Sequence, residues 1–591
     1  MNARREGETV HPVFWIFDIL LTALFAAVLE LNKNTLAGWL LLVIVAVLWT
    51  LFYRLKFVPA CGFAKFLWWI GYIAFFAGIL FLTWPPVRAV GASDDPNPRA
   101  TEAVRTDKGL VSGVYSKDGK VEIYAGIPYA KPPVGELRWR APQDPEPWDG
   151  VLECSEFAPM SMQVQNLPIY ESLARIIGYH DYRISLKDNW IPPVSEDSLY
   201  LNIWKPAGEQ SGLPVLVYIH GGSLQTGQPW YPDYNGSSFA EDGVVCVNMG
   251  YRLGVFGFLA DEEMLALEGT TGNYGLLDQI KALEWVRDNI AAFGGDPSNV
   301  TIVGESAGSV CVDALCVSPL AKGLFRRAVL ESSTLAGVNP PHSYRTFDEA
   351  LKSGSALKAR YGASDISALR KLDAKKIAGE MNSQHHVTVD GYVLPDSPYN
   401  LRKAGVHNEQ AILHGYNSEE SGPFIIFGHA NMKNYEKKVR AYFKDYADDV
   451  LALYPAKTDE EADRYWARIY GAVFFDYPHY CLNRLAAGQG IPVYEYLFSK
   501  DNGSLGPWHS GELIYAFGRI PEDSKLFDQA DRALSDRMHA AWVSFAKTGN
   551  PGFEPNPTSA RLMEFGDNIG MIDEPSLDFY EVMDRMQGFG K

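Results

Sequence analysis

The run VTIVGESAG, residues 300–308, decides the fold class of this chain. Its first half, Val300–Val303, is rich in β-branched residues and predicts a buried strand. The apolar stretch Ala307–Cys316 predicts a helix. Ser306 therefore falls on a sharp turn between strand and helix, and glycines on either side suit a turn too tight for a side chain. This arrangement, called a nucleophile elbow, presents a reactive serine hydroxyl at a helix N-terminus.

A glycine-rich loop supplies what a serine nucleophile needs next. The apolar stretch Pro214–Ile219 predicts a strand, and it runs directly into His220-Gly221-Gly222-Ser223. Loops of this composition offer backbone N–H groups to the oxyanion that forms when a serine attacks a carbonyl. We expect the donors of this oxyanion hole to be the N–H groups of Gly222, Ser223 and Ala307.

Short apolar runs alternate with helix-like stretches along the rest of this region. The helix-like stretches include Leu276–Ala292 and Glu460–Tyr470. Such alternation predicts an α/β fold, with a mainly parallel central sheet that carries helices on both faces. The predicted strands are Pro214–Ile219, Val244–Asn248, Val300–Val303, Arg327–Leu330, Ala411–Leu413 and Val493–Phe498.

A serine hydroxyl also needs a base to take its proton, and in this fold class the chain order is serine, acid, histidine. His509 lies in a loop rich in glycine and serine directly after the predicted strand Val493–Phe498, which is a catalytic location. His479 and His539 lie in helix-like contexts, and His429 follows the acid candidates too closely. We therefore predict that His509 is the base.

Two glutamates compete for the role of the acid. The predicted strand 410–414 leads into the loop 415–422, which contains Glu419 and Glu420. Either residue could orient the histidine by its place in the loop alone, and a pair of surface glutamates is often only solvated charge. These residues by themselves leave the choice open.

The first 90 residues differ from the rest of the chain. They contain three apolar stretches, each about as long as a helix that crosses a bilayer. The stretches are Val13–Leu31, which includes Asp18, Leu36–Tyr53 and Phe66–Trp84. We predict three transmembrane helices, and hence a multi-pass membrane protein.

Positive charges around these helices predict their orientation, because they gather at the cytoplasmic ends of membrane spans. The N-terminus is then cytoplasmic, and everything beyond Trp84 lies on the periplasmic or extracellular side. The small residues Val90-Gly91-Ala92 leave open a cleavage after the third helix. The charges are Arg4 and Arg5 before the first helix, Lys33 after it, and Arg54, Lys56 and Lys65 between the second and third.

Three segments are expected from these patterns. Residues 1–86 form the membrane region. Residues 87–104 contain prolines, glycine and paired aspartates without apolar periodicity, and predict a linker. Residues 105–591 form the α/β domain.

Composition narrows the function classes. The formal net charge of −18 argues against a nucleic-acid partner, because that affinity needs a basic surface. The six cysteines form no CxxC pair, and no cysteine and histidine cluster has the spacing of metal ligands. We therefore expect no metal or other cofactor. The predicted serine nucleophile and the apolar helices instead indicate a small ester and membrane lipid as the partners.

Beyond these patterns, the sequence between roughly Lys108 and Gly566 resembles the type-B carboxylesterase family, which includes acetylcholinesterase and bacterial para-nitrobenzyl esterases. Several long motifs carry the resemblance, and they run without a break into the elbow. They are YAGIPYA at 124–130, PPVG at 132–135, EDSLYLN at 196–202, YRLG at 251–254, GNYGLLDQ at 272–279 and FGGDP at 293–297.

The resemblance implies an α/β-hydrolase fold and a catalytic triad of Ser306, Glu420 and His509. The acid of the family lies in a Gly-x-Asn-x-Asp-Glu-Gly run, which selects Glu420 and puts Glu419 in the aspartate position. The family's His-Gly-x-Glu run falls on residues 509–512 and selects His509, with Ser510 in place of the glycine.

Four further positions also depart from the family pattern. Ser161 and Ser198 replace a pair of cysteines, so the resemblance implies that this family disulfide is absent. Ser223 and Ser333 stand where glycine is usual. The segment between the first two serines forms the rim of the substrate gorge in related enzymes, and its aromatic residues are candidates for the pocket or for core packing. They are Tyr170, Tyr179, Tyr182 and Trp190.

Together these patterns predict a membrane-tethered serine carboxylesterase that hydrolyses small alkyl or aryl esters through an acyl-enzyme. Two alternatives remain open. Some cholinesterase-like domains have lost the nucleophile and act as adhesion or binding modules, whereas here all three triad positions are filled. An amidase or thioesterase could use the same triad.

Overall fold

The structure is a computed structural model of the chain. It describes residues 12–55, 62–177, 184, 189–339, 344–380, 386–426, 428–501, 506–558 and 560–590. The chain forms two compact units. The first unit consists of Met1–Ala89 and Gln165–Pro193, and the second consists of Val90–Val164 and Val194–Lys591.

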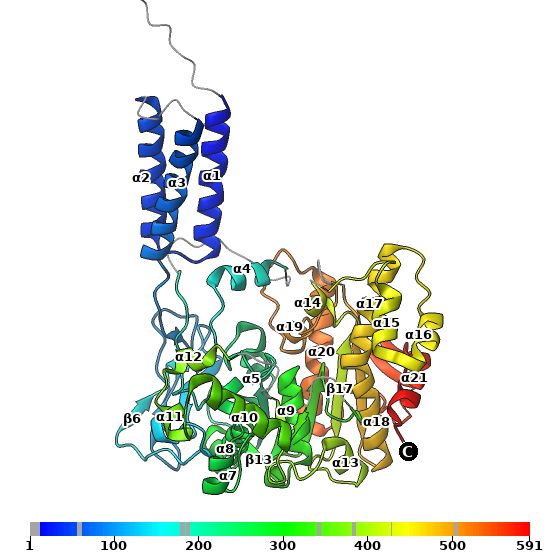
Figure 1. Cartoon of the computed structure of the whole chain (residues 1–591). Helices are drawn as coiled ribbons and strands as arrows, with labels where there is room; N and C mark the ends of the chain where they lie inside the picture. Colours follow the sequence, from blue (N-terminus) through cyan, green and yellow to red (C-terminus); the bar gives the residue numbers. More distant parts are fainter. Residues whose placement is uncertain are drawn as a thin grey trace, which may run out of the picture. The chain divides into compact units, whose positions relative to one another are not determined.

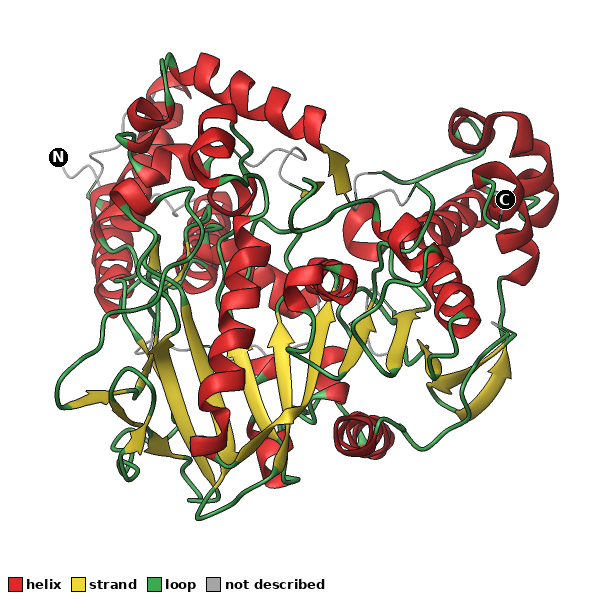
Figure 2. Ribbon diagram, turned by 90° about the horizontal axis from the view of Figure 1, so that it is seen from below, coloured by secondary structure: helices red, strands yellow, loops and turns green. Residues whose placement is uncertain are grey.

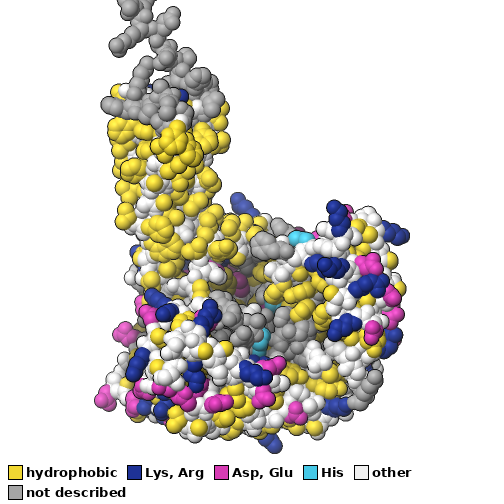
Figure 3. Space-filling view, viewed as in Figure 1, with side chains coloured by type: hydrophobic (Ala, Val, Ile, Leu, Met, Phe, Trp, Pro, Cys, Tyr) yellow, Lys and Arg dark blue, Asp and Glu magenta, His cyan; other side chains and the backbone are white. Residues whose placement is uncertain are grey.

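The first unit contains three long apolar helices, α1 (Pro12–Leu31), α2 (Leu36–Arg54) and α3 (Gly62–Leu82), which are long and apolar enough to cross a membrane (Figure 1). Their mutual contacts are largely aromatic, and the rings of Phe25 and Phe76 stack at 3.9 Å. Asp18 is buried in α1, where one of its carboxylate oxygens accepts a hydrogen bond from the Thr50 hydroxyl of α2 at 3.1 Å. Hydrophobic side chains cover the face of the bundle seen in Figure 3.

A short amphipathic helix, α4 (Pro168–Ile177), also belongs to the first unit. It lies in a segment that leaves the second unit after Val164 and returns at Val194. The two ends of this segment are close together, because β8 (Met160–Ser161) pairs in parallel with β9 (Val194–Ser195). Neither the length of the segment nor its composition predicts that it groups with the three apolar helices.

An 11-stranded sheet forms the centre of the second unit. The seven strands from β19 to β12 run parallel, and the strands at both edges pair antiparallel (Figure 2). In spatial order they are β20 (Ile569–Asp573), β19 (Arg561–Phe565), β18 (Val493–Phe498), β17 (Ile412–Asn417), β14 (Arg327–Glu331), β13 (Gly295–Glu305), β11 (Leu213–Ile219), β12 (Val245–Met249), β10 (Tyr200–Pro206), β5 (Val121–Pro128) and β4 (Val114–Tyr115). The predicted mainly parallel sheet is confirmed.

Smaller sheets and many helices surround the central sheet. The other strands are β1 (Val90–Gly91), β2 (Val104–Arg105), β3 (Leu110–Ser112), β6 (Val151–Glu153), β7 (Glu156–Phe157), β15 (Tyr344–Thr346) and β16 (Val387–Val389). The helices are α5 (Ser237–Glu241), α6 (Gly254–Phe258), α7 (Glu262–Glu268), α8 (Tyr274–Asn289), α9 (Ala307–Val317), α10 (Phe347–Tyr361), α11 (Ile366–Arg370), α12 (Ala374–Ala378), α13 (Pro398–Lys403), α14 (Gly422–Ile425), α15 (Tyr435–Phe443), α16 (Ala447–Leu453), α17 (Asp459–Gly471), α18 (Tyr477–Gly488), α19 (Leu513–Ala516), α20 (Gln529–Thr548) and α21 (Leu577–Gln587).

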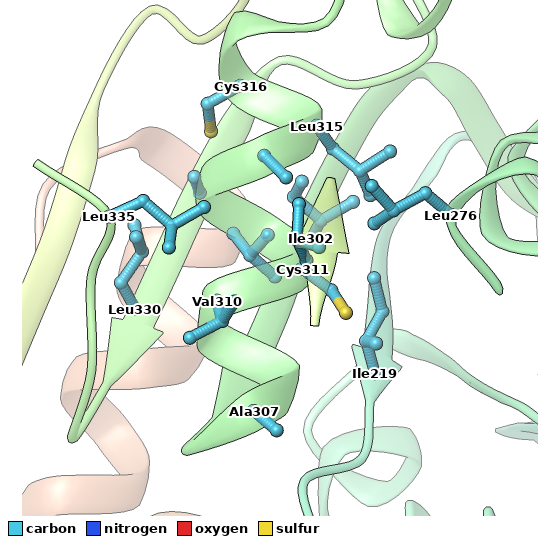
Figure 4. Close-up of a cluster of buried hydrophobic side chains, with 14 of the residues drawn as sticks. Ile219, Leu276, Ile302, Ala307, Val310, Cys311, Leu315, Cys316, Leu330 and Leu335 are labelled. Carbon is cyan, nitrogen blue, oxygen red and sulfur yellow. The ribbon is translucent and has the colours of Figure 1, made fainter. Parts of the chain in front are cut away.

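Helices α9 and α20 pack on opposite faces of the sheet. Leu330 of β14 lies in the apolar cluster around α9, together with Ile302 and Ile219 (Figure 4). The next residue, Glu331, accepts a hydrogen bond from Trp542 of α20 at 2.7 Å. Successive residues of a strand point to opposite faces, so the two helices cover different sides of the sheet.

The register of the parallel strands brings five loops to one edge of the sheet. Residue pairs across the sheet align Ile219 with Gly304, Glu305 with Glu331 and Glu331 with Gly415. The loops that follow β11, β13, β14, β17 and β18 therefore start at the same level. Every residue in the predicted active site lies in, or next to, one of these loops.

Candidate active site

The serine at the elbow has the backbone conformation that the sequence predicts. Strand β13 ends at Glu305, Ser306 has φ 55° and ψ −125°, and α9 begins at Ala307. A Cβ at Gly308 would meet the carbonyl oxygen of Ile219, and a Cβ at Gly304 would meet the backbone of Gly308. Only glycine fits at both positions, so the tight turn that exposes Ser306 depends on them.

The loop after β11 passes directly beside the serine. A Cβ built on Gly221 would lie 3.1 Å from the Cβ of Ser306. The chain then turns through positive φ at Gly222 (103°) and Ser223 (57°). Because Ser223 carries a side chain, this conformation costs about 1–2 kcal/mol more than the same conformation of a glycine. This strained loop holds backbone N–H groups close to the nucleophile.

Three of those N–H groups are the predicted oxyanion donors. Within the described part of the chain, the N–H groups of Gly222, Ser223 and Ala307 have no protein acceptor. His220 stiffens the base of the loop, because its Nδ1 lies 2.9 Å from the carbonyl oxygen of Gly221. Burial lowers the pKa of His220 to about 4, so this ring is neutral near pH 7.

The predicted base and acid form a direct pair. The Nδ1 atom of His509 lies 2.6 Å from Oε2 of Glu420. Both side chains are buried, and the histidine ring packs between Phe424 and Phe475 with centroid distances of 5.0 and 4.8 Å. Glu419 is exposed instead. Of the two glutamates that loop position left open, the structure thus brings Glu420 to the histidine.

Backbone and side-chain hydrogen bonds fix this pair. The N–H of Asn417 donates to Oε1 of Glu420 at 2.8 Å. The side-chain amide of the same asparagine donates to the carbonyl oxygen of Trp508, the residue before His509, at 2.8 Å. Burial raises the pKa of Glu420, and the N–H of Asn417 opposes that rise. Asn417 therefore positions both members of the pair.

A second carboxylate reaches the other side of the histidine. Oε1 of Glu305 lies 3.2 Å from Nε2 of His509, and the Ser510 hydroxyl donates to the same oxygen at 2.6 Å. Burial raises the pKa of Glu305 to about 7, while His509 and the hydrogen bond from Ser510 lower it. Glu305 directly precedes Ser306 in the chain. This contact therefore ties Nε2 of His509 to the residue next to the predicted nucleophile.

Two further buried glutamates stand behind these residues. Glu512 accepts hydrogen bonds from the side-chain amide of Asn417 at 2.5 Å and from the Ser332 hydroxyl at 3.3 Å. Glu331 accepts from Trp542. Burial raises the pKa of Glu512 to about 7 and raises the pKa of Glu331 as well. These buried glutamates cannot all be ionised around one histidine, because the low dielectric penalises several like charges. The glutamates therefore share protons near neutral pH.

The other histidines that the sequence offered lie elsewhere. His429 is exposed and pairs with Asp463 at 2.8 Å. His479 lies in the core, with its Nδ1 3.0 Å from Nδ1 of His414, and His539 bonds to the carbonyl oxygen of Ala516 at 2.8 Å. Within the described residues, no group of three or more histidine, cysteine or acidic side chains could hold a metal ion.

Three of the serines that depart from the family pattern make ordinary hydrogen bonds. The Ser161 hydroxyl donates to the carbonyl oxygen of Tyr251 at 2.7 Å, and the Ser198 hydroxyl donates to the carbonyl oxygen of Glu196 at 3.4 Å. Ser333 accepts a hydrogen bond at its carbonyl oxygen from Ser309 at 2.5 Å. The five described cysteines, Cys154, Cys246, Cys311, Cys316 and Cys481, are buried and unpaired.

Sequence reasoning gave no role to Glu305, Asn417, Ser510 or Glu512, although each lies inside a quoted motif. No local signal could have found Glu305, because glutamate is rarely buried unless it is paired and the partners of this residue lie about 200 positions further along the chain. The rim aromatics are only partly described. Tyr170 is exposed in α4, whereas Tyr179 and Tyr182 lie outside the described residues.

Comparison with known proteins gives one consistent family. The model of the carboxylesterase family matches residues 100–568. The chain is 32% identical to the fumonisin B1 esterase of Sphingopyxis macrogoltabida, over 85% of this chain and 94% of that protein. It is 32% identical to the para-nitrobenzyl esterase of Bacillus subtilis, over 77% and 91%, and 31% identical to the acetylcholinesterase of Leptinotarsa decemlineata, over 76% and 79%. The protein is a serine ester hydrolase of the carboxylesterase family, with the α/β-hydrolase fold.

Proposed function

We propose that this enzyme hydrolyses small alkyl or aryl esters in two steps, with Ser306, His509 and Glu420 as its triad. The observation that carries the proposal is the 2.6 Å contact between His509 Nδ1 and Glu420, together with the 3.2 Å contact of Nε2 with Glu305, the residue before Ser306. The carboxylate fixes Nδ1 as the protonated nitrogen, so Nε2 is free to act as the base.

In the first step Nε2 of His509 takes the proton of the Ser306 hydroxyl while the oxygen attacks the ester carbonyl. The carbonyl oxygen becomes an oxyanion, and the N–H groups of Gly222, Ser223 and Ala307 donate to it. Nε2 then returns the proton to the leaving alcohol. In the second step Nε2 deprotonates a water, which attacks the carbonyl carbon of the acyl-enzyme. The bond to Ser306 then breaks, the acid leaves, and Nε2 returns the proton to the serine oxygen.

Glu305 favours the charged intermediate of both steps. Its carboxylate lies 3.2 Å from Nε2, so it stabilises the positive ring that forms when the proton moves. Glu420 does the same from the other side of the ring.

The experiment compares the Ser306→Ala variant with the unchanged enzyme on para-nitrophenyl acetate. Removal of the nucleophile should lower kcat by a factor on the order of 10⁶. A fluorophosphonate probe should label the enzyme and leave the variant unlabelled. Retained turnover in the variant would reject the assignment, and a folded enzyme that neither reacts with the probe nor turns over esters would be a binding module.

The same proposal includes a membrane anchor. Residues 1–86 would span a membrane three times, residues 87–104 would link them to the catalytic domain 105–591, and that domain would lie on the periplasmic or extracellular side. The apolar length of α1, α2 and α3 supports this. Protease added outside cells, with any outer membrane permeabilised, should digest the catalytic domain, and full protection would refute the orientation.

A further inference from the structure

Helix α4 exposes an apolar face that no described residue covers. Residues at helical spacing along one side of it point outward, and residues three or four apart on a helix lie on one face. Tyr170 is 64% exposed, Leu173 40% and Ile177 43%, and Ile176 beside them is 47% exposed. Leu167 extends the same face by one turn before the helix. An exposed apolar stripe of this kind marks an interaction surface.

The opposite face of α4 is fastened to the end of the three-helix bundle. The buried Ser172 hydroxyl donates to the carbonyl oxygen of Leu31, the last residue of α1, at 2.7 Å. The side chain of Asn189, at the far end of the same segment, donates to the carbonyl oxygen of Asn34 at 2.8 Å. Helix α4 therefore lies across this end of α1, at the level of the turn between α1 and α2 (Figure 1).

That level is where the apolar helices give way to polar groups. Asn34 is fully buried and donates to the carbonyl oxygen of Leu80 and to the Thr83 hydroxyl at 2.9 and 3.0 Å. The N–H of Thr35 donates to the carbonyl oxygen of Thr83 at 3.1 Å. Polar groups with such partners mark the boundary of a membrane-spanning bundle, because the hydrocarbon core contains none to satisfy them.

We propose that α4 lies in the headgroup layer of a membrane, with its apolar face buried among the lipids beside the bundle. This inference rests on the proposal that α1, α2 and α3 span that membrane. Glu171 and Arg175, which lie between the anchored and the apolar faces, suit a helix that lies flat at the interface. The catalytic domain is then attached to the membrane region at two places in the sequence, which are the end of α3 and the segment that contains α4.

Lipid fits this surface better than a second protein. The outward side chains of α2, such as Leu40 and Val47, are as exposed as those of α4, so the two surfaces are of one kind. The four exposed apolar side chains of α4, together with Leu167, offer far less than the ~800 Å² per partner that a stable protein interface buries. A ten-residue helix with charged flanks is also ample for an interfacial anchor.

The geometry also has a consequence for orientation. Because the segment with α4 starts and ends in the second unit, the turn between α1 and α2 lies on the same side of the membrane as the catalytic domain. The end of α3 lies there as well, through the bond between Thr35 and Thr83. This agrees with three crossings and does not use the distribution of positive charges.

The test is the depth of nitroxide labels in the full chain, reconstituted in vesicles of equimolar phosphatidylcholine and phosphatidylglycerol. Single cysteines replace Tyr170 or Leu173 on the apolar face, Glu171 as the matched control on the same helix, and Val47 as a marker for the spanning helices. The background carries Cys61→Ser, because the other five cysteines are buried. Retained hydrolysis of para-nitrophenyl acetate shows that each variant is folded.

We expect oxygen to relax the labels at Tyr170 and Leu173 more strongly than a water-soluble nickel chelate does, at a depth of about 5–10 Å below the phosphates. The label at Glu171 should show the reverse order. Equal access of the chelate to Tyr170, Leu173 and Glu171, with Val47 in lipid, would overturn the inference and leave the spanning helices intact. Labels shielded from both reagents would mean that protein covers α4, which also overturns it. A Val47 label open to the chelate would reject the membrane spans and the inference with them.

Discussion

Removal of the Ser510 hydroxyl should shift the pH dependence of catalysis. This hydroxyl donates to Oε1 of Glu305 at 2.6 Å, and the same oxygen lies 3.2 Å from Nε2 of His509. The hydrogen bond favours the ionised carboxylate, yet burial still raises the pKa of Glu305 to about 7. An ionised Glu305 stabilises the positive ring of His509, so activity should rise as the pH increases through the pKa of Glu305.

The size of the shift follows from the strength of one hydrogen bond. A hydrogen bond to a charged group contributes about 1.5–3 kcal/mol, and one pKa unit corresponds to about 1.4 kcal/mol. Loss of the bond in Ser510→Gly should therefore raise the pKa of Glu305 by about one to two units. The ionised fraction at pH 7 then falls from about one half to between about one tenth and one hundredth, so kcat/KM falls by roughly five-fold to fifty-fold there and recovers to within about two-fold near pH 9.

The assay is kcat/KM for para-nitrophenyl acetate from about pH 5.5 to 9. Ser510→Ala should give the same shift in pH, because it also lacks the hydroxyl. Ser510 has φ 70°, so the glycine variant should be about 1 kcal/mol more stable than the alanine variant in urea unfolding. In the Glu305→Gln background, Ser510→Gly should cause no further shift, although a pH step remains because His509 must itself be unprotonated to act as the base. An unchanged midpoint in Ser510→Gly, or a shift by Ser510→Gly that persists in the Glu305→Gln background, would refute this reasoning.

Three further changes test other parts of the site and the core. Glu420→Gln should lower kcat by about 10⁴, because the histidine loses its orienting carboxylate, whereas Glu419→Gln at the exposed neighbour should change kcat less than about two-fold; similar losses in the two variants would contradict the assignment. Gly308→Ala should destabilise the enzyme by about 3 kcal/mol or more in urea unfolding, because its Cβ would meet the carbonyl oxygen of Ile219, while Gly488→Ala, which meets nothing, should leave the stability within about 1 kcal/mol. Burial lowers the pKa of His479 well below its usual value, so this ring stays neutral in the folded state while the unfolded chain binds a proton there below about pH 6.5. The free energy of unfolding therefore decreases by about 1.4 kcal/mol per pH unit as the pH falls. His479→Gln should remove this contribution from the dependence of the unfolding free energy on pH between about pH 6.5 and 5. A slope that does not change would show that this histidine is protonated in the folded state.

Much of the fold could be predicted because its signals are local. The parallel strands are buried on both faces, so β11, β13 and β18 read as short apolar runs, and the elbow at Ser306 is confined to nine consecutive residues. Motifs likewise placed Glu420 and His509 in loops after strands. The register that brings those loops to one edge is a property of parallel sheets in general.

Other features depend on contacts between distant residues, which a single sequence does not reveal. The bond from Ser510 to Glu305 joins residues 205 positions apart, and the bond from Ser172 to Leu31 joins residues 141 positions apart. Nothing in the composition of the segment 165–193 indicates that it belongs with the first unit rather than with the strands on either side of it. The domain boundaries at 86 and 104 remain predictions for the same reason.

The two ends of the segment that carries α4 lie close together, which matters for the design of a shortened, water-soluble enzyme. Deletion of residues 1–89 alone would leave the side chains of Ser172 and Asn189 without their hydrogen-bond acceptors. It would also leave α4 with an uncovered apolar surface, and such surfaces promote aggregation. Since Met160 already pairs with Val194, a short glycine and serine bridge from Val164 to Val194 could replace that segment with little disturbance of its surroundings. Under the proposed membrane anchor, a water-soluble form of this esterase therefore requires that residues 1–89 and the segment with α4 are removed together.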